Sequence, residues 1–259
     1  MELLKTIIVC LFAGCGAGLG TGFAGMSAAA VITPMLVTFL GIPAYSAVGI
    51  ALASDVLASA VSSYTYGKNK NLDIKNGSIM MAFVLLFTVV GSYVAGLLPD
   101  KTMGSFSVVM TMFLGVKFIV KPVMTTKEAM QSVDPKKRVI QSIFSGAMIG
   151  FICGFVGAGG GMMMLLILTS VLGYELKTAV GTSVFIMTFT ALTGSVSHFI
   201  IDGDTPDILV LTLCIIFTLV FARIGARVAN KASTKTLNRA TGAILIVLGV
   251  VVLGANYIK

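Results

Sequence analysis

Charged residues are scarce in this chain, and their scarcity excludes a soluble globular protein. Only 11% of the 259 residues are charged and 57% are hydrophobic, whereas soluble domains usually carry about one-quarter charged residues. The mean hydropathy is +1.02. The composition therefore predicts a polytopic membrane protein.

The chain also lacks the residue patterns of an intramembrane enzyme or a soft-metal carrier. It holds one histidine, His198, and one acid deep in an apolar segment, Asp55, so it supplies neither a His-Glu-x-x-His helix nor two facing aspartates. The four cysteines lie in apolar segments and predict no disulfide framework. No Cys-x-x-Cys pair gathers thiolates, although fifteen methionines leave a copper-handling protein open as an alternative. We predict no catalysis, no bound metal and no cofactor.

Long apolar runs predict membrane-spanning helices. At about 20 residues per span, such runs cross the hydrocarbon core as helices, and they lack the polar–apolar alternation of barrel strands. The clearest runs are Ile79 to Leu98, Met103 to Val120, Ile208 to Ala222 and Leu237 to Ala255.

The second half of the chain repeats the first. A shift of 132 residues, which a loop insertion later increases to 134, aligns the two copies. Duplicated halves with glycine-broken apolar segments at corresponding positions point to a secondary transporter and to its substrate site. The aligned pairs include Gly14/Gly146, Gly18/Gly150, Gly22/Gly154, Gly25/Gly157, Gly49/Gly181, Ser63/Ser195 and Gly91/Gly225.

The repeat divides the chain into a first membrane repeat (residues 1–122), a linker (123–138) and a second membrane repeat (139–259). In each repeat a long apolar stretch (3–40 and 139–172) is too long for one span and short for two. Because glycines interrupt it, we predict two short half-helices that meet near mid-membrane, followed by three transmembrane helices. The predicted fold is thus an all-α polytopic membrane protein with two Gly-broken helical hairpins.

Loop charges predict that the two repeats are inverted, since cytoplasmic loops collect Lys and Arg. The loop with Lys68, Lys70, Asp73 and Lys75 carries a net charge of +2, and its counterpart with Asp202, Asp204 and Asp207 carries −3. The segment from Lys121 to Arg138 carries +3. We therefore place the linker in the cytoplasm and both termini outside the cell membrane, and we interpret the cations as topology signals, not as a nucleic-acid surface.

Two segments carry a family resemblance. Residues 154–161 (Gly-Phe-Val-Gly-Ala-Gly-Gly-Gly), followed by an apolar helix and then by 179–183 (Ala-Val-Gly-Thr-Ser), resemble the sulfite exporter TauE/SafE family over almost the whole chain. The resemblance implies a multi-pass protein of the cell membrane that moves sulfite, organosulfonates or related anions through the bilayer. The first copy departs from the pattern, because Gly25-Met26-Ser27-Ala28-Ala29-Ala30 replaces the run of glycines.

The glycine breaks suit an anionic substrate. A half-helix N-terminus exposes unpaired N–H groups and carries about half a positive charge, glycine lets an anion approach the backbone, and hydroxyls can donate to it. The alternative is that these glycines only permit close helix packing. The predicted substrate-binding residues are Ser27, Ala28, Thr33, Gly157, Gly159, Gly160, Gly161, Thr182 and Ser183.

Asp55 is the predicted proton-coupling residue, because ionisable groups inside a membrane are costly and functional by default. Its repeat partner is Met187, so only one copy carries the acid. The alternative is a structural acid bonded to Ser54, Ser59 or the backbone. The sequence leaves open a carboxylate substrate, export or import, and a homo-oligomer.

Overall fold

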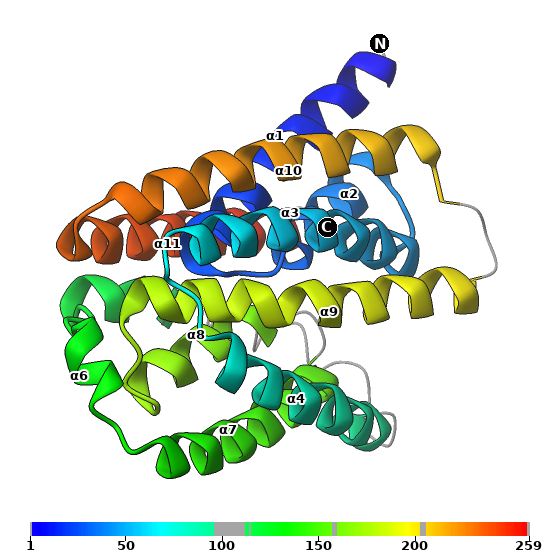
Figure 1. The fold of residues 1–259 in the computed structure, drawn as a ribbon. Coiled ribbons are helices and arrows are strands. Elements are labelled where there is room, and N and C mark those ends of the chain that lie inside the picture. Colours follow the sequence, from blue (N-terminus) through cyan, green and yellow to red (C-terminus); the bar gives the residue numbers. More distant parts are fainter. Residues whose placement is uncertain (1, 96–111, 114, 157–159, 203–205, 258–259) are drawn as a thin grey trace.

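Within the residues that the structure describes, every regular element is an α-helix (Figure 1). The computed structural model describes residues 2–95, 112–113, 115–156, 160–202 and 206–257. The labelled helices are α1 (Glu2–Ala24), α2 (Ala29–Leu40), α3 (Ala44–Lys68), α4 (Ile74–Ala95), α6 (Lys127–Gln131), α7 (Pro135–Val156), α8 (Gly160–Ser170), α9 (Leu176–Asp202), α10 (Ile208–Lys231) and α11 (Thr234–Tyr257).

Several helices have the length and composition of membrane spans. Among the described residues, the five that qualify lie in α1, α3, α9, α10 and α11, and α2 is a shorter apolar helix. Helices with their backbone hydrogen bonds satisfied internally are the spans that a bilayer tolerates. The all-helical, multi-pass part of the prediction is confirmed.

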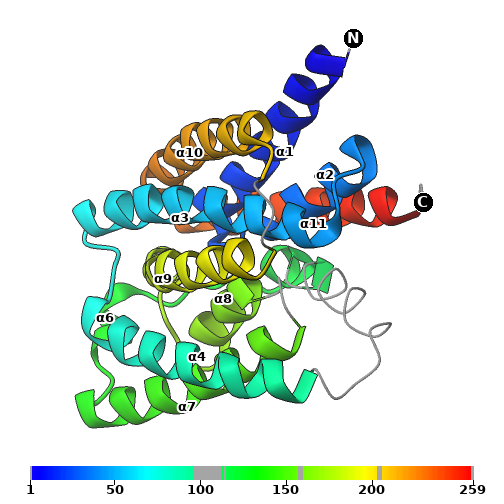
Figure 2. The same ribbon diagram turned by 90° about the vertical axis from the view of Figure 1, so that its right-hand side faces the viewer.

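Helices α3 and α9 form the middle of the molecule and run antiparallel. In Figures 1 and 2 they lie between α1 and α10 on one side and α4 and α7 on the other. A Cβ built on Gly49 would lie 3.4 Å from the Cβ of His198, and one built on Gly181 would lie 2.8 Å from that of Tyr66. The two contacts are equivalent in the repeat, because a shift of 132 residues relates Gly49 to Gly181 and Tyr66 to His198.

Glycines on α1 bring its backbone close to α10. Cβ atoms built on Gly14, Gly18 and Gly22 would come within 2.5 to 2.6 Å of α10 atoms, at successive turns. The same role falls to Gly146 and Gly150 on α7, whose built Cβ atoms would come within 2.7 and 2.4 Å of α4 carbonyl oxygens. These glycines therefore occur where parallel helices pack closely, which small residues allow in membranes.

The first apolar stretch does not form two short half-helices, so that expectation is wrong for α1. This helix has 23 residues and continues through Gly14, Gly18 and Gly22, whereas α2 has 12. The packing against α10 offsets the low helix propensity of the glycines. The chain breaks only after Ala24, and in the second copy α7 has 22 residues and α8 has 11.

Candidate functional site

Gly25 ends α1, and side chains from distant helices satisfy the backbone carbonyls that this end exposes. Its φ of +59° is a left-handed conformation that glycine adopts without strain. The Tyr66 hydroxyl donates to the Gly22 carbonyl at 2.8 Å, Ser183 Oγ to the Gly25 carbonyl at 3.0 Å, and Thr241 Oγ1 to the Phe23 carbonyl at 3.2 Å. Such partners are required because lipid offers no hydrogen bonds.

The side chain of Asp55, which belongs to α3, lies at the N-terminus of α2. The sequence predicted a substrate anion at this place. Ser27 Oγ donates to Asp55 Oδ2 at 2.7 Å and accepts from the Ala29 N–H at 3.3 Å. The Ala28 N–H also faces this carboxylate. The side chain is 1% exposed, and Oδ1 has no hydrogen-bond partner in the described part of the chain.

The serines expected to hold Asp55 in a structural role do not bond its carboxyl group. Ser54 Oγ donates to the Ile50 carbonyl at 2.9 Å, and Ser59 Oγ donates to the backbone carbonyl of Asp55 at 2.5 Å. The partner is instead Ser27, which comes from the break between α1 and α2. The carboxylate therefore joins α3 to the start of α2.

The start of α8 packs directly against the first break. A Cβ built on Gly161 would lie 2.9 Å from both the Gly25 carbonyl oxygen and the Ser27 nitrogen, and 2.7 Å from the Met187 sulfur. Met187 and Asp55, which are equivalent in the repeat, thus both face this meeting point. The first break therefore touches the start of α8 at Gly161.

The predicted site residues do not all lie together. Ser27, Ala28, Asp55, Gly161 and Ser183 converge at the meeting point of the breaks, and Gly160 begins α8. Thr33 lies one turn into α2 with a buried Oγ1 that lacks a partner among the described residues. Thr182 points elsewhere and accepts from the Asp73 N–H at 3.2 Å, because successive helical side chains diverge by about 100°. Gly157 and Gly159 lie outside the described residues.

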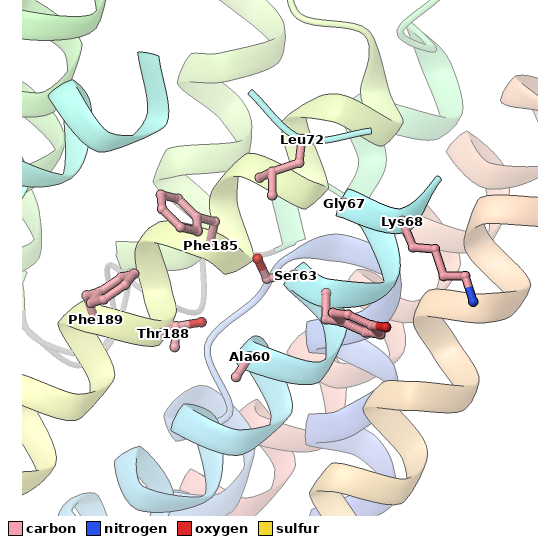
Figure 3. Close-up of a pocket in the computed structure, with 9 residues that line it drawn as sticks. Ala60, Ser63, Gly67, Lys68, Leu72, Phe185, Thr188 and Phe189 are labelled. Carbon is pink, nitrogen blue, oxygen red and sulfur yellow. The ribbon is translucent and has the colours of Figure 1, made fainter. Parts of the chain in front are cut away.

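A cavity of about 600 Å³ lies between the last turns of α3 and the first half of α9, away from the breaks. Figure 3 shows Phe185, Thr188 and Phe189 on one wall, Ala60 and Ser63 on the other, and the Lys68 ammonium pointing away from the phenyl rings. Its lining is mostly apolar, and no described residue predicted for the site contributes to it. This cavity does not have the character of an anion site.

The linker contacts the loop between α3 and α4. Lys127 Nζ donates to Asn71 Oδ1 at 2.6 Å, and Asn71 Nδ2 donates to Asn230 Oδ1 at 2.7 Å. Nearby, Tyr174 Oη donates to Asp73 Oδ2 at 2.9 Å, and burial together with this carboxylate raises the pKa of Tyr174. The linker and this loop therefore lie at the same end of the molecule, as the charge pattern requires.

Apolar spans packed around the break between α1 and α2 define a polytopic helical membrane protein, and a broken helix of this kind is typical of the transporter class. No group of three or more His, Cys, Asp or Glu side chains that could hold a metal occurs in the part of the chain that the structure describes. Residues 10–252 match the family model for the sulfite exporter TauE/SafE, and the chain belongs to that family.

Curated relatives carry names in the same class. The probable membrane transporter protein YunE of Bacillus subtilis is 25% identical over 245 residues, which cover 90% of this chain and 89% of the relative. The probable membrane transporter protein MJ0441 of Methanocaldococcus jannaschii is 26% identical, covering 91% and 88%. A probable membrane transporter protein of Haemophilus influenzae is 25% identical, covering 94% and 97%. No solved structure matches significantly.

Proposed function

We propose that this protein is a secondary transporter that moves a small sulfur-containing anion, sulfite or an organosulfonate, across the cytoplasmic membrane by alternating access. The observation that carries the proposal is the contact between the first break and the start of α8, with Asp55, Ser27 and Ser183 around it. Broken helices that meet inside a membrane bundle are the usual substrate sites of such transporters. Membership of the sulfite exporter family supports a sulfur-containing anion.

The contacts between helices support an inverted repeat. Helices α3 and α9 are equivalent in the repeat and antiparallel, as inversion requires. The first helix of each copy packs on the fourth helix of the other, α1 on α10 and α7 on α4. With the linker (123–138) in the cytoplasm and both termini outside, the two copies expose one central site to alternate sides.

The site as described is closed, which supports a cycle with at least two states. The Gly161 backbone lies against Gly25 and Ser27 with no room for an added Cβ, so no anion fits between these two segments as they stand. Substrate binding requires the two breaks to separate. Ser27, Ser183, Thr33 and the N–H groups at the starts of α2 and α8 then supply hydrogen-bond donors for the sulfonate oxygens.

We assign proton coupling to Asp55, because it is the buried acid at this closed site. The carboxyl group lies at a helix N-terminus beside a hydroxyl, and it can be either charged or neutral. The charged form repels a neighbouring anion, whereas the neutral form does not. A proton gradient can then drive transport through the occupancy of this one group.

Flux of labelled sulfite and organosulfonates into proteoliposomes, with and without a proton gradient, tests the proposal. We expect uptake of these anions, and about tenfold slower uptake by Ser27→Ala, since a hydrogen bond to a charged group contributes about 1.5–3 kcal/mol. Ser62→Ala is the matched control, because Ser62 is also buried but has no hydrogen-bond partner among the described residues. Uptake of simple carboxylates alone would favour that substrate class, and copper accumulation without anion flux would overturn the proposal.

A further inference from the structure

We propose that Asp55 is a built-in competitor of the substrate: its carboxylate occupies the anion-binding N-terminus of α2, and the transported anion replaces it only when Asp55 binds a proton. This inference rests on the proposed function, that the chain transports an anion. It goes further by predicting that each anion is bound together with one proton.

The contacts of Asp55 are those that an anionic ligand would make. The carboxylate accepts from the Ser27 hydroxyl at 2.7 Å, and the Ala28 N–H faces it. Ala28 is the N-cap residue of α2, which has 12 residues, and its own side chain makes no cap hydrogen bond. The Ser27 hydroxyl takes that part by accepting from the Ala29 N–H at 3.3 Å. A helix N-terminus with a neighbouring hydroxyl is a site for one anion, and here the protein itself fills it.

One carboxylate oxygen of Asp55 accepts no hydrogen bond from the described residues. Oδ1 is buried without a hydrogen-bond partner in the described part of the chain, although carboxylate oxygens in such surroundings normally accept at least one bond. A buried, unpartnered carboxylate oxygen at a helix terminus marks a place where a further group binds. We assign that group as the proton, which converts the carboxylate to a neutral acid and leaves all covalent bonds of the substrate unchanged.

No charged side chain on the packed helices offers Asp55 another partner. Helix α2 has no charged residue, and the charges of α1 and of α9 lie near their ends. The cations of α10 are exposed, whereas Asp55 is 1% exposed. The charged and titratable residues of these packed helices are Glu2 and Lys5 of α1, Lys177, His198 and Asp202 of α9, and Arg223, Arg227 and Lys231 of α10.

Competition follows from charge. A substrate anion at the start of α2 would lie next to the carboxylate, and two negative charges in an apolar interior repel strongly. A displaced carboxylate would also lose its donors without gaining water, which disfavours the charged form. Binding a proton removes both costs. Because Met187 stands where the second copy would have this acid, the chain has one such competitor and takes up one proton per anion.

Isothermal titration calorimetry of the full chain in detergent tests this coupling. Methanesulfonate is the probe, because its sulfonate remains ionised at neutral pH, so any proton taken up on binding comes to the protein. Titrations in two buffers of different ionisation enthalpy measure the number of protons bound. Where Asp55 is ionised in the free protein, we expect uptake of about one proton per methanesulfonate and an affinity that falls about tenfold per pH unit. At lower pH, where the acid is already neutral, both effects should vanish.

The variant Asp55→Asn should bind methanesulfonate without proton uptake and with an affinity independent of pH. Asp134→Asn removes an exposed linker acid and is the matched control, which should behave as the unmodified chain does. Binding by the unmodified chain without proton uptake at any pH from 6 to 9 overturns the inference and the coupling role of Asp55, and it leaves the proposed anion transport standing. Absence of binding of both methanesulfonate and sulfite to the unmodified chain overturns both. The measurement on the unmodified chain decides the matter even if Asp55→Asn does not fold.

Discussion

The hydroxyl of Tyr66 shows how single residues make the break after α1 stable in a membrane. It is fully buried and donates to the Gly22 carbonyl, which the end of α1 leaves without a helical partner. An unsatisfied carbonyl in an apolar interior is costly. Tyr66 therefore supports the candidate site although it does not face the predicted anion.

Replacing Tyr66 with Phe should destabilise the protein. Losing one partner of a buried hydrogen bond costs about 1–3 kcal/mol, so we expect a lower thermal unfolding temperature in detergent. Tyr64→Phe is the matched control, because Tyr64 is two residues away and 72% exposed. Equal effects of the two substitutions would contradict this role of the Tyr66 hydroxyl.

At this scale the sequence predicted the acid but not its partner. Asp55 stands out as the one acid deep in an apolar segment, because burial of a charge is costly wherever it occurs. Ser27 is separated from it by 28 residues, and hydroxyls are common in α3. Only the way α2 folds back on α3 decides which serine meets the carboxylate.

Among the elements, the glycine stripe of α1 and its counterpart on α7 determine how closely helices approach. The stripe lets α1 pack on α10, and the counterpart lets α7 pack on α4. In a membrane such contacts depend on van der Waals packing, since lipid is as apolar as the helices. The repeated glycines thus serve two purposes: close packing along α1 and α7, and contact of the first break with the start of α8 at Gly25 and Gly161.

Gly18→Ala and Gly150→Ala should both reduce the yield of folded protein. An added Cβ would lie 2.5 Å from the Thr218 carbonyl oxygen in the first case and 2.4 Å from that of Val84 in the second, so a helix must shift. In contrast, Gly254→Ala meets nothing within 4 Å and should be neutral or stabilising, because alanine favours helix over glycine by about 1 kcal/mol. Size-exclusion profiles and thermal unfolding would compare the three, and a harmless Gly150→Ala would argue against equivalent packing in the two copies.

The boundaries of these elements were only partly predictable. Helix α10 begins at Ile208, where the sequence predicts an apolar run to begin, and the Asp207 side chain caps it by accepting from the Leu209 N–H. The long first helix was missed because glycine frequency suggested a break, whereas contacts with α10 keep the backbone helical. Helix propensity describes each residue by itself and does not include the contacts with α10.

For the whole molecule, the loop charges and the packing of the linker imply one orientation. Lys127 of the linker bonds to Asn71 in the loop after α3, so those two segments share a side. Cysteines introduced as Ser132→Cys and Lys75→Cys, both at exposed positions, should react with a membrane-impermeant maleimide only after the cells are opened. Ile208→Cys, exposed at the other end of α9 and α10, should react in intact cells.

The unmodified chain is the control for this labelling. Cys10 and Cys214 are buried, and Cys15 is partly buried. The unmodified chain also carries Cys153, and the label that it takes up is subtracted from that of each variant. If the cysteine at position 132 of the linker reacted in intact cells, the protein would have the opposite orientation to the one proposed. Equal labelling of positions 132 and 208 from one side would contradict the inverted arrangement itself.

The sequence by itself determined the membrane class, the duplication and the family, and it singled out Asp55 as a candidate, because composition, periodic glycines and a lone acid in an apolar run are properties of the chain before it folds. Only the tertiary structure decided that α1 continues through its glycines, that Gly161 closes on Gly25 and Ser27, and that the carboxylate of Asp55 occupies the start of α2. These are contacts between residues distant in sequence, and their free energies depend on which backbone atoms the packed helices bring together.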